Sequence, residues 1–146
     1  MKLFHISGDI SDLNEISFKP RVPLFRAKGE NDTIPRVCFS DSILGCLRAI
    51  PECDECGLGY KMTKKLNFNT PVLYDVYMLD TSCLGDKEIL NPNQLKRLEY
   101  VPDANNNNEY WILSEITCSK IFRINITDVI VDEQGNEEIL YEKLFT

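Results

Sequence analysis

The sequence predicts a compact single α+β domain over residues 1–146, with a twisted mixed or antiparallel β-sheet core and one main helix at about 41–50. Short segments rich in β-branched and aromatic residues recur along the chain, and the clearest of them, at 71–79, also alternates in polarity. An apolar stripe at helical spacing is clear only between Ser40 and Pro51. A β-rich chain with one clear helix is typical of the α+β class.

The expected elements follow one another with irregular connections. The helix begins after Ser40 and Asp41, because either side chain can accept amide hydrogen bonds of a first turn, and it ends before Pro51. The segment 8–35 is expected to be irregular, and long loops in compact domains are often functional. Residues 103–108 should form a polar loop. Strands are expected at 2–7, 36–39, 71–79, 109–114, 119–125 and 128–132, a short helix or turn at 92–98, and a closing strand or helical turn at 137–145.

The net charge of the chain narrows the classes of partner that it can bind. The formal net charge is −7, so phosphate backbones are repelled and nucleic acid is an unfavourable partner, whereas a basic protein surface is a suitable one. No apolar stretch reaches the length of a membrane span, and the first residues lack the long apolar segment of a secretion signal. We therefore expect a cytoplasmic protein with reduced cysteines.

The cysteines do not predict a metal site. Cys53 and Cys56 have the spacing of a zinc-ligand pair, but the sequence offers no second close pair to complete a tetrahedral site. Pro51 and Gly57 flank this pair, so it lies in a loop rather than at the strand-to-helix step that a redox pair requires. Metal binding by the pair stays open.

The only histidine is a candidate ligand-binding residue. His5 lies between Phe4 and Ile6 in the expected first strand, so its side chain should point to the opposite side, together with Ser7. There it could bind a ribose hydroxyl or a phosphate. The alternative is a structural histidine that hydrogen-bonds a backbone carbonyl group.

Ser40 and Glu109 are the next candidates. Ser40 lies between a strand and a helix, where its hydroxyl could orient a sugar or phosphate or could simply cap the helix. Glu109 opens a strand after four asparagines, where a carboxylate can stabilise a developing cation such as an oxocarbenium ion. Glu109 could equally be a solvated strand end, and Glu115 is a rival carboxylate.

Two arginines follow prolines and form a further pair of candidates. Arg21 and Arg36 each extend from a stiff backbone, and a guanidinium group matches the geometry of a pyrophosphate. The alternatives are surface charges or a salt bridge within an acidic protein.

These segments resemble the ADP-ribosyltransferase-like fold. Phe4-His5-Ile6-Ser7 resembles the opening strand of that family, and Cys38-Phe39-Ser40-Asp41-Ser42 resembles its strand-to-helix step. Glu109 stands where a later strand of the family starts with the catalytic glutamate. The resemblance follows the chain in order through short motifs, and the size is similar to that of small phage-borne inhibitors of bacterial defence.

The resemblance implies a transferase that uses NAD as substrate and moves ADP-ribose to a macromolecular acceptor, most simply a protein. Glu109 would be the catalytic residue. The family often has Glu or Gln two positions before this residue, but Asn107 stands there, so the acceptor is left open. The residues implied to bind NAD are His5, Ser7, Arg21, Arg36, Ser40 and Tyr110, and Tyr110, Tyr60 or Tyr74 could serve as the aromatic cover for nicotinamide.

A different class of function fits the same sequence. A non-catalytic acidic protein could block a basic surface of a partner, such as a host defence protein, and the net charge of −7 suits that role.

Overall fold

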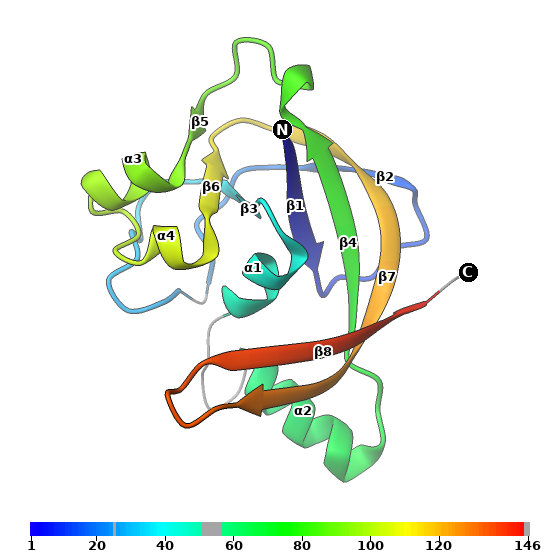
Figure 1. Cartoon of the computed structure of the whole chain (residues 1–146). Coiled ribbons are helices and arrows are strands. Elements are labelled where there is room, and N and C mark those ends of the chain that lie inside the picture. The colour runs from blue at the N-terminus through cyan, green and yellow to red at the C-terminus, as the bar shows by residue number, and fades with distance from the viewer. Residues whose placement is uncertain (25, 51–56, 145–146) are drawn as a thin grey trace.

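The computed structural model describes residues 1–24, 26–50 and 57–144 as an α+β fold (Figure 1). In this part of the chain, eight strands form one antiparallel sheet in the order β2-β7-β4-β1-β3-β6-β5, and β8 pairs with β7. The predicted fold class is confirmed. The strands are β1 (Lys2–Ser7), β2 (Glu15–Phe18), β3 (Val37–Ser40), β4 (Leu73–Asp80), β5 (Ile89–Leu90), β6 (Glu109–Ile112), β7 (Ile116–Val131) and β8 (Glu137–Leu144).

β7 shapes the sheet. Its first half pairs with β2 on one side and with β4 on the other, and its second half pairs with β8. Its register shifts opposite β4 between Val76 and Tyr77, and opposite β8 between Ile126 and Asp128. Such bulges bend a strand and increase its twist, which accounts for the curve of β7 in Figure 1. The strands expected at 119–125 and 128–132 are parts of this one strand.

The two faces of the sheet carry different apolar clusters, as the period of two along a strand requires. On one face, buried side chains that include Leu3, Phe39 and Tyr77 form the Leu3 cluster. On the other face, side chains of β4 and β7 pack against α1 and α2 in the Val76 cluster. A third group, the Trp111 cluster, consists of Leu90, Leu95, Val101, Ala104 and Trp111.

The predicted helix at 41–50 is present as α1 (Ile43–Arg48). Its N-cap is Ser42, whose hydroxyl accepts a hydrogen bond from the Gly45 amide at 3.0 Å. The prediction that this is the main helix is wrong, because α2 (Gly57–Phe68) is longer. The sequence signal for α2 is weak, since its buried stripe holds little beyond Leu58 and Met62. None of the helices in the described residues is both long and apolar enough to cross a membrane.

The polar segment at 103–108 contains a helical turn, α4 (Ala104–Asn107), and not only the loop that was expected. Ala104 is 1% exposed within the Trp111 cluster, so the turn has an apolar anchor. The segment 8–35, which was expected to be irregular, contains the strand β2. The segment 92–98 contains the short helix α3 (Pro92–Arg97), and the closing segment is the strand β8. A short 3₁₀ turn, η1 (Thr81–Cys83), follows β4.

Candidate functional site

A pocket of about 590 Å³ lies where α1, α2, α4 and the start of β6 come together. This volume falls within the range of roughly 300–1,000 Å³ that is usual for small-molecule sites. The pocket, which we call the Glu109 pocket, has apolar walls from the helices and a charged rim. Its charged lining residues are Arg26, Lys28, Glu30, Arg48, Asp103, Glu109 and Glu137.

Glu109 is the first residue of β6 and follows Asn108, which has a left-handed backbone conformation (φ 48°). Its carboxylate accepts a hydrogen bond from Trp111 Nε1 at 3.2 Å. Burial raises the pKa of Glu109 to about 7, and the charge of Glu30 adds to this effect. The Trp111 hydrogen bond and the charge of Arg36 oppose it. The carboxyl group can therefore gain or lose a proton near neutral pH.

Arg36 is part of the wall behind this carboxylate. Its side chain is fully buried and forms an ion pair with Glu30. The guanidinium group also donates to the Ile34 carbonyl oxygen at 2.9 Å and lies 4.0 Å from the centre of the Trp111 ring. Arg36 thus forms the internal salt bridge that the sequence allowed as an alternative to pyrophosphate binding. It holds Glu30 in place beside the pocket.

Ser40 faces Glu109 directly across the β3–β6 pair. Residues opposite each other in an antiparallel pair point to the same face of the sheet. The Ser40 hydroxyl is buried and donates a hydrogen bond to the Asn107 carbonyl oxygen at 2.6 Å. Ser40 therefore fastens α4 to the end of β3 beside the Glu109 pocket, and it does not cap α1, whose N-cap is Ser42.

His5 points to the other face of the sheet. Phe4, its neighbour, is the residue that pairs with Ser40, so His5 lies on the face of the Leu3 cluster. Its ring is 4.5 Å from that of Phe18, and Nδ1 donates to the Cys38 carbonyl oxygen at 2.7 Å. Burial lowers the pKa of His5 below its usual value. His5 therefore makes the hydrogen bond to a backbone carbonyl group that is expected of a structural histidine. The sheet separates it from Glu109.

The remaining candidates also lie away from the Glu109 pocket. Tyr110 follows Glu109 on β6, so it points to the face of the Leu3 cluster, and its hydroxyl contacts Met1 Sδ at 3.5 Å. The Ser7 hydroxyl accepts from the Asp9 amide at 3.1 Å in a local turn. Arg21 is exposed and meets Arg36 through backbone hydrogen bonds. The structure brings together Glu109, Ser40 and Arg36, and none of the other four candidates lines the Glu109 pocket.

Sequence reasoning missed the basic residues at the rim of this pocket. Arg26 and Lys28 belong to the long segment before β3, whose length was the only signal. Arg48 is in the last turn of α1, where it also donates to the Glu137 carbonyl oxygen at 2.8 Å. These three side chains can bind an anionic group, while Glu109 supplies an acid–base group.

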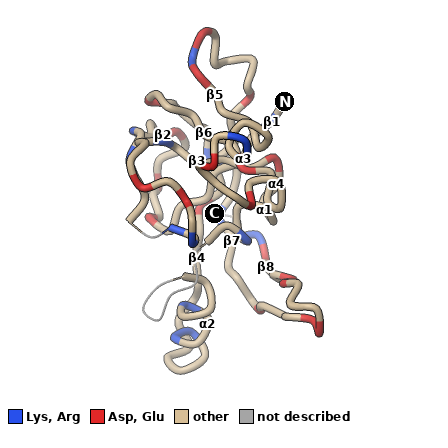
Figure 2. The backbone as a smooth tube through the Cα atoms, turned by 90° about the vertical axis from the view of Figure 1, so that its left-hand side faces the viewer, with Lys and Arg blue, Asp and Glu red and all other residues tan. Residues whose placement is uncertain are grey.

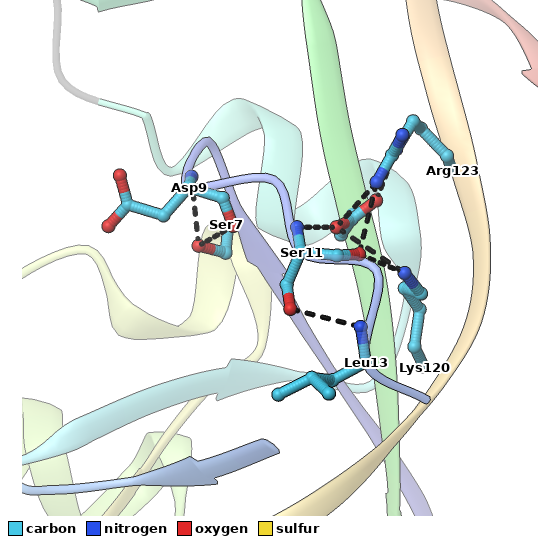
Figure 3. Close-up of polar contacts among 7 residues, drawn as sticks. Ser7, Asp9, Ser11, Leu13, Lys120 and Arg123 are labelled. Atoms are coloured by element: carbon cyan, nitrogen blue, oxygen red, sulfur yellow. Dashed lines mark hydrogen bonds and ion pairs between the residues drawn. The ribbon is translucent and has the colours of Figure 1, made fainter. Parts of the chain in front are cut away.

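A second polar cluster was also missed, because its members are far apart in the sequence. Asp75 has no exposed side-chain surface, and Arg123 Nε donates to its carboxylate at 2.7 Å. The Ser11 amide donates to the same carboxylate at 2.8 Å, and the Ser11 carbonyl oxygen accepts from Arg123 and Lys120 (Figure 3). Although burial alone would raise the pKa of Asp75, these donors lower it. The cluster fastens the loop after β1 to β4 and β7.

Comparisons with protein-family models, with curated proteins and with solved structures found no match to this chain. The described residues contain no group of three or more His, Cys, Asp or Glu side chains placed to hold a metal ion. Cys53 and Cys56 lie outside the described residues. We therefore base the proposed function on the chemistry of the Glu109 pocket.

Proposed function

We propose that this protein binds NAD in the Glu109 pocket and transfers ADP-ribose to a macromolecular acceptor, most simply a protein. The observation that carries the proposal is a half-buried carboxyl group with a pKa of about 7 in a pocket whose lining includes Arg26, Lys28 and Arg48. The carboxylate suits the reacting sugar, and the three basic side chains suit the pyrophosphate of NAD.

In the proposed reaction, the bond between the ribose carbon and the nicotinamide nitrogen breaks, and its electron pair leaves with nicotinamide. The sugar carbon then carries positive charge, which the ionised Glu109 carboxylate stabilises. A nucleophilic atom of the acceptor forms the new bond to that carbon. Its proton passes to Glu109, which releases it to solvent.

The proposal assigns new roles to several residues. Arg26, Lys28 and Arg48 take the pyrophosphate role that the sequence gave to Arg21 and Arg36. Ser40 acts indirectly, because its hydroxyl holds Asn107 and with it the turn that precedes Glu109. His5, Ser7 and Tyr110 have no part in NAD binding.

The cationic nicotinamide ring of NAD favours the ionised form of a nearby carboxyl group. NAD should therefore bind more tightly as the pH rises through about 7, where Glu109 loses its proton. The four described free cysteines fit a reducing compartment, so we place this activity in the cytoplasm.

The test measures thermal stabilisation by NAD and release of nicotinamide in the presence of cell lysate. The wild-type protein should show both, and Glu109→Gln should lose turnover by about 100-fold or more. Glu115→Gln is the matched control, because Glu115 is an exposed carboxylate near the far end of β6. If millimolar NAD produced neither stabilisation nor nicotinamide, the proposal would be rejected.

A second candidate is the acidic binding protein that blocks a basic surface. It is favoured by the β7–β8 hairpin, which carries acidic residues at its tip (Figure 2). Asp132, Glu133 and Glu138 are exposed there. Such a protein would form a 1:1 complex with its target, and Glu109→Gln would keep its full potency.

A further inference from the structure

α2 concentrates positive charge in a chain whose net charge is −7. Lys61, Lys64 and Lys65 lie within two turns of this helix. Among the described residues, the basic partner in every ion pair lies outside α2. Figure 2 shows this basic stretch on a helix at the periphery of the molecule. The charge of these lysines is therefore not neutralised within the described part of the protein.

Two of the three ammonium groups are held in position by the fold. Lys61 Nζ donates to the Tyr74 hydroxyl at 3.1 Å and lies 4.7 Å from the centre of that ring. Lys65 Nζ donates to the Ile126 carbonyl oxygen at 2.9 Å. An ammonium group has three N–H donors, so each of these lysines keeps donors for a ligand. Lys64 is exposed.

The same lysines border a hollow of about 280 Å³. Ile10, Val72 and Leu73 contribute apolar atoms to its lining. Helical spacing places Phe68 on the lysine side of α2, since it lies four residues after Lys64. Phe68 is 71% exposed and Ile10 is 43% exposed. Positive charge and exposed apolar surface thus lie together, and we call this area the α2 surface.

We infer that the α2 surface is a docking site for a short acidic segment of a partner protein. Carboxylates of that segment would pair with the lysines, and an apolar side chain beside them would pack on Phe68 and Ile10. This inference goes beyond the NAD proposal and does not depend on it.

Charge favours a short acidic segment as the occupant over a nucleic acid or a second copy of this chain. A phosphate backbone brings many negative charges close to the whole chain, and a second copy of the protein brings −7. A short acidic segment brings only the few charges that the lysines can neutralise.

The experiment measures fluorescence anisotropy of a labelled peptide built from Glu and Leu, with a Gln–Leu peptide as reference, at about 0.15 M salt. Lys64→Glu is the main variant, because Lys64 is exposed and its replacement leaves the contacts of Lys61 and Lys65 intact. Lys96→Glu on α3 is the matched control, with the same change of charge at another exposed helical position. Phe68→Ser tests the apolar contact.

We expect the Glu–Leu peptide to bind better than the Gln–Leu peptide. Lys64→Glu should weaken that binding roughly fivefold or more, and Phe68→Ser should also weaken it, while Lys96→Glu leaves it nearly unchanged. Equal effects of Lys64→Glu and Lys96→Glu would show general electrostatics and overturn the inference. It would also be overturned if the two peptides bound alike, or if light scattering showed a dimer of this chain that Lys64→Glu dissociates.

Discussion

The indole Nε1 of Trp111 donates a hydrogen bond to the Glu109 carboxylate at 3.2 Å. Trp111 is fully buried, with the guanidinium group of Arg36 and the ring of Tyr100 against it. This bond connects the candidate catalytic group to the Trp111 cluster. The position and acidity of Glu109 thus depend on the packing of an apolar core.

The first prediction concerns this hydrogen bond. Trp111→Phe removes the donor that stabilises the ionised carboxylate, so the pKa of Glu109 should rise above about 7. The measurement is an NMR titration of the Glu109 side chain. Tyr110→Phe is the control, because Tyr110 lies on the opposite face of β6, and it should leave that pKa unchanged. An unchanged Glu109 pKa in Trp111→Phe would contradict the assigned role of the indole.

The second prediction concerns the pH dependence of stability. Glu109 has a pKa of about 7 in the folded protein against 4.5 as its ordinary value. Its contribution to stability is therefore fully present below pH 4.5 and is lost as the pH rises to about 7. Glu109→Gln should remove this loss, which amounts to at most ~3 kcal/mol.

Urea unfolding at a series of pH values checks this prediction. Relative to the wild type, the Gln variant should gain stability between pH 4.5 and 7. Glu115→Gln should run parallel to the wild type. A constant difference between wild type and Glu109→Gln across this range would show that the carboxyl group does not titrate as described.

The third prediction concerns Asp75. Asp75→Asn leaves Arg123 and Lys120 without their counter-ion, and it should lower the free energy of unfolding by about 2–3 kcal/mol, less than for a fully buried pair because both cations are partly exposed. The pKa of Asp75 is lowered in the fold, so its stabilisation is lost as the pH falls below 3.8. The variant should lack that acid-induced loss.

Denaturant unfolding at neutral and acid pH tests the Asp75 prediction. Asp86→Asn, in an exposed loop, is the control and should change little. If Asp75→Asn were as stable as the wild type at neutral pH, the cluster would not fasten the loop after β1.

The fourth prediction concerns the contact between α1 and α4. A Cβ atom on Gly45 would lie 2.2 Å from Ser40 Oγ and 2.7 Å from the Asn107 carbonyl oxygen. The carbonyl belongs to the backbone and cannot rotate away, so Gly45→Ala should cost about 1–3 kcal/mol of stability. It should also weaken NAD binding, since α4 precedes Glu109.

Gly59→Ala is the control for this prediction, because a Cβ there meets no atom within 4 Å. In the helix α2 it should raise the melting temperature slightly, as alanine is the better helix former. Thermal unfolding distinguishes the two variants. Equal melting temperatures would contradict the close packing of α1 on α4.

Local sequence signals predicted much of the fold. Alternation and β-forming residues located β4, and the period of two along β1 correctly put the His5 side chain on the side opposite to Phe4. The helix α1 followed from its apolar stripe and from the proline after it. These features depend on residues close in the chain, so the sequence alone determines them.

The tertiary structure decided which candidates share a site. Ser40 and Glu109 lie on one face because β3 pairs with β6 in that register, and His5 lies on the other face because Phe4 pairs with Ser40. A shift of one residue would reverse these faces. No local pattern encodes such a register, since it depends on packing between strands far apart in the chain.

Packing between distant segments also explains why the sequence did not reveal the contact between Asp75 and Arg123 or the helix α2. Asp75 and Arg123 are 48 positions apart and meet only because β4 pairs with β7. α2 has a weak apolar stripe, and its placement over the Val76 cluster depends on packing against the sheet. The sequence by itself located β1, β3, β4, β6 and β7 and the direction of the side chains along them, but not the short strands β2 and β5. Only the folded chain determined which side chains meet, because burial and charge pairing act between segments that the sequence keeps apart.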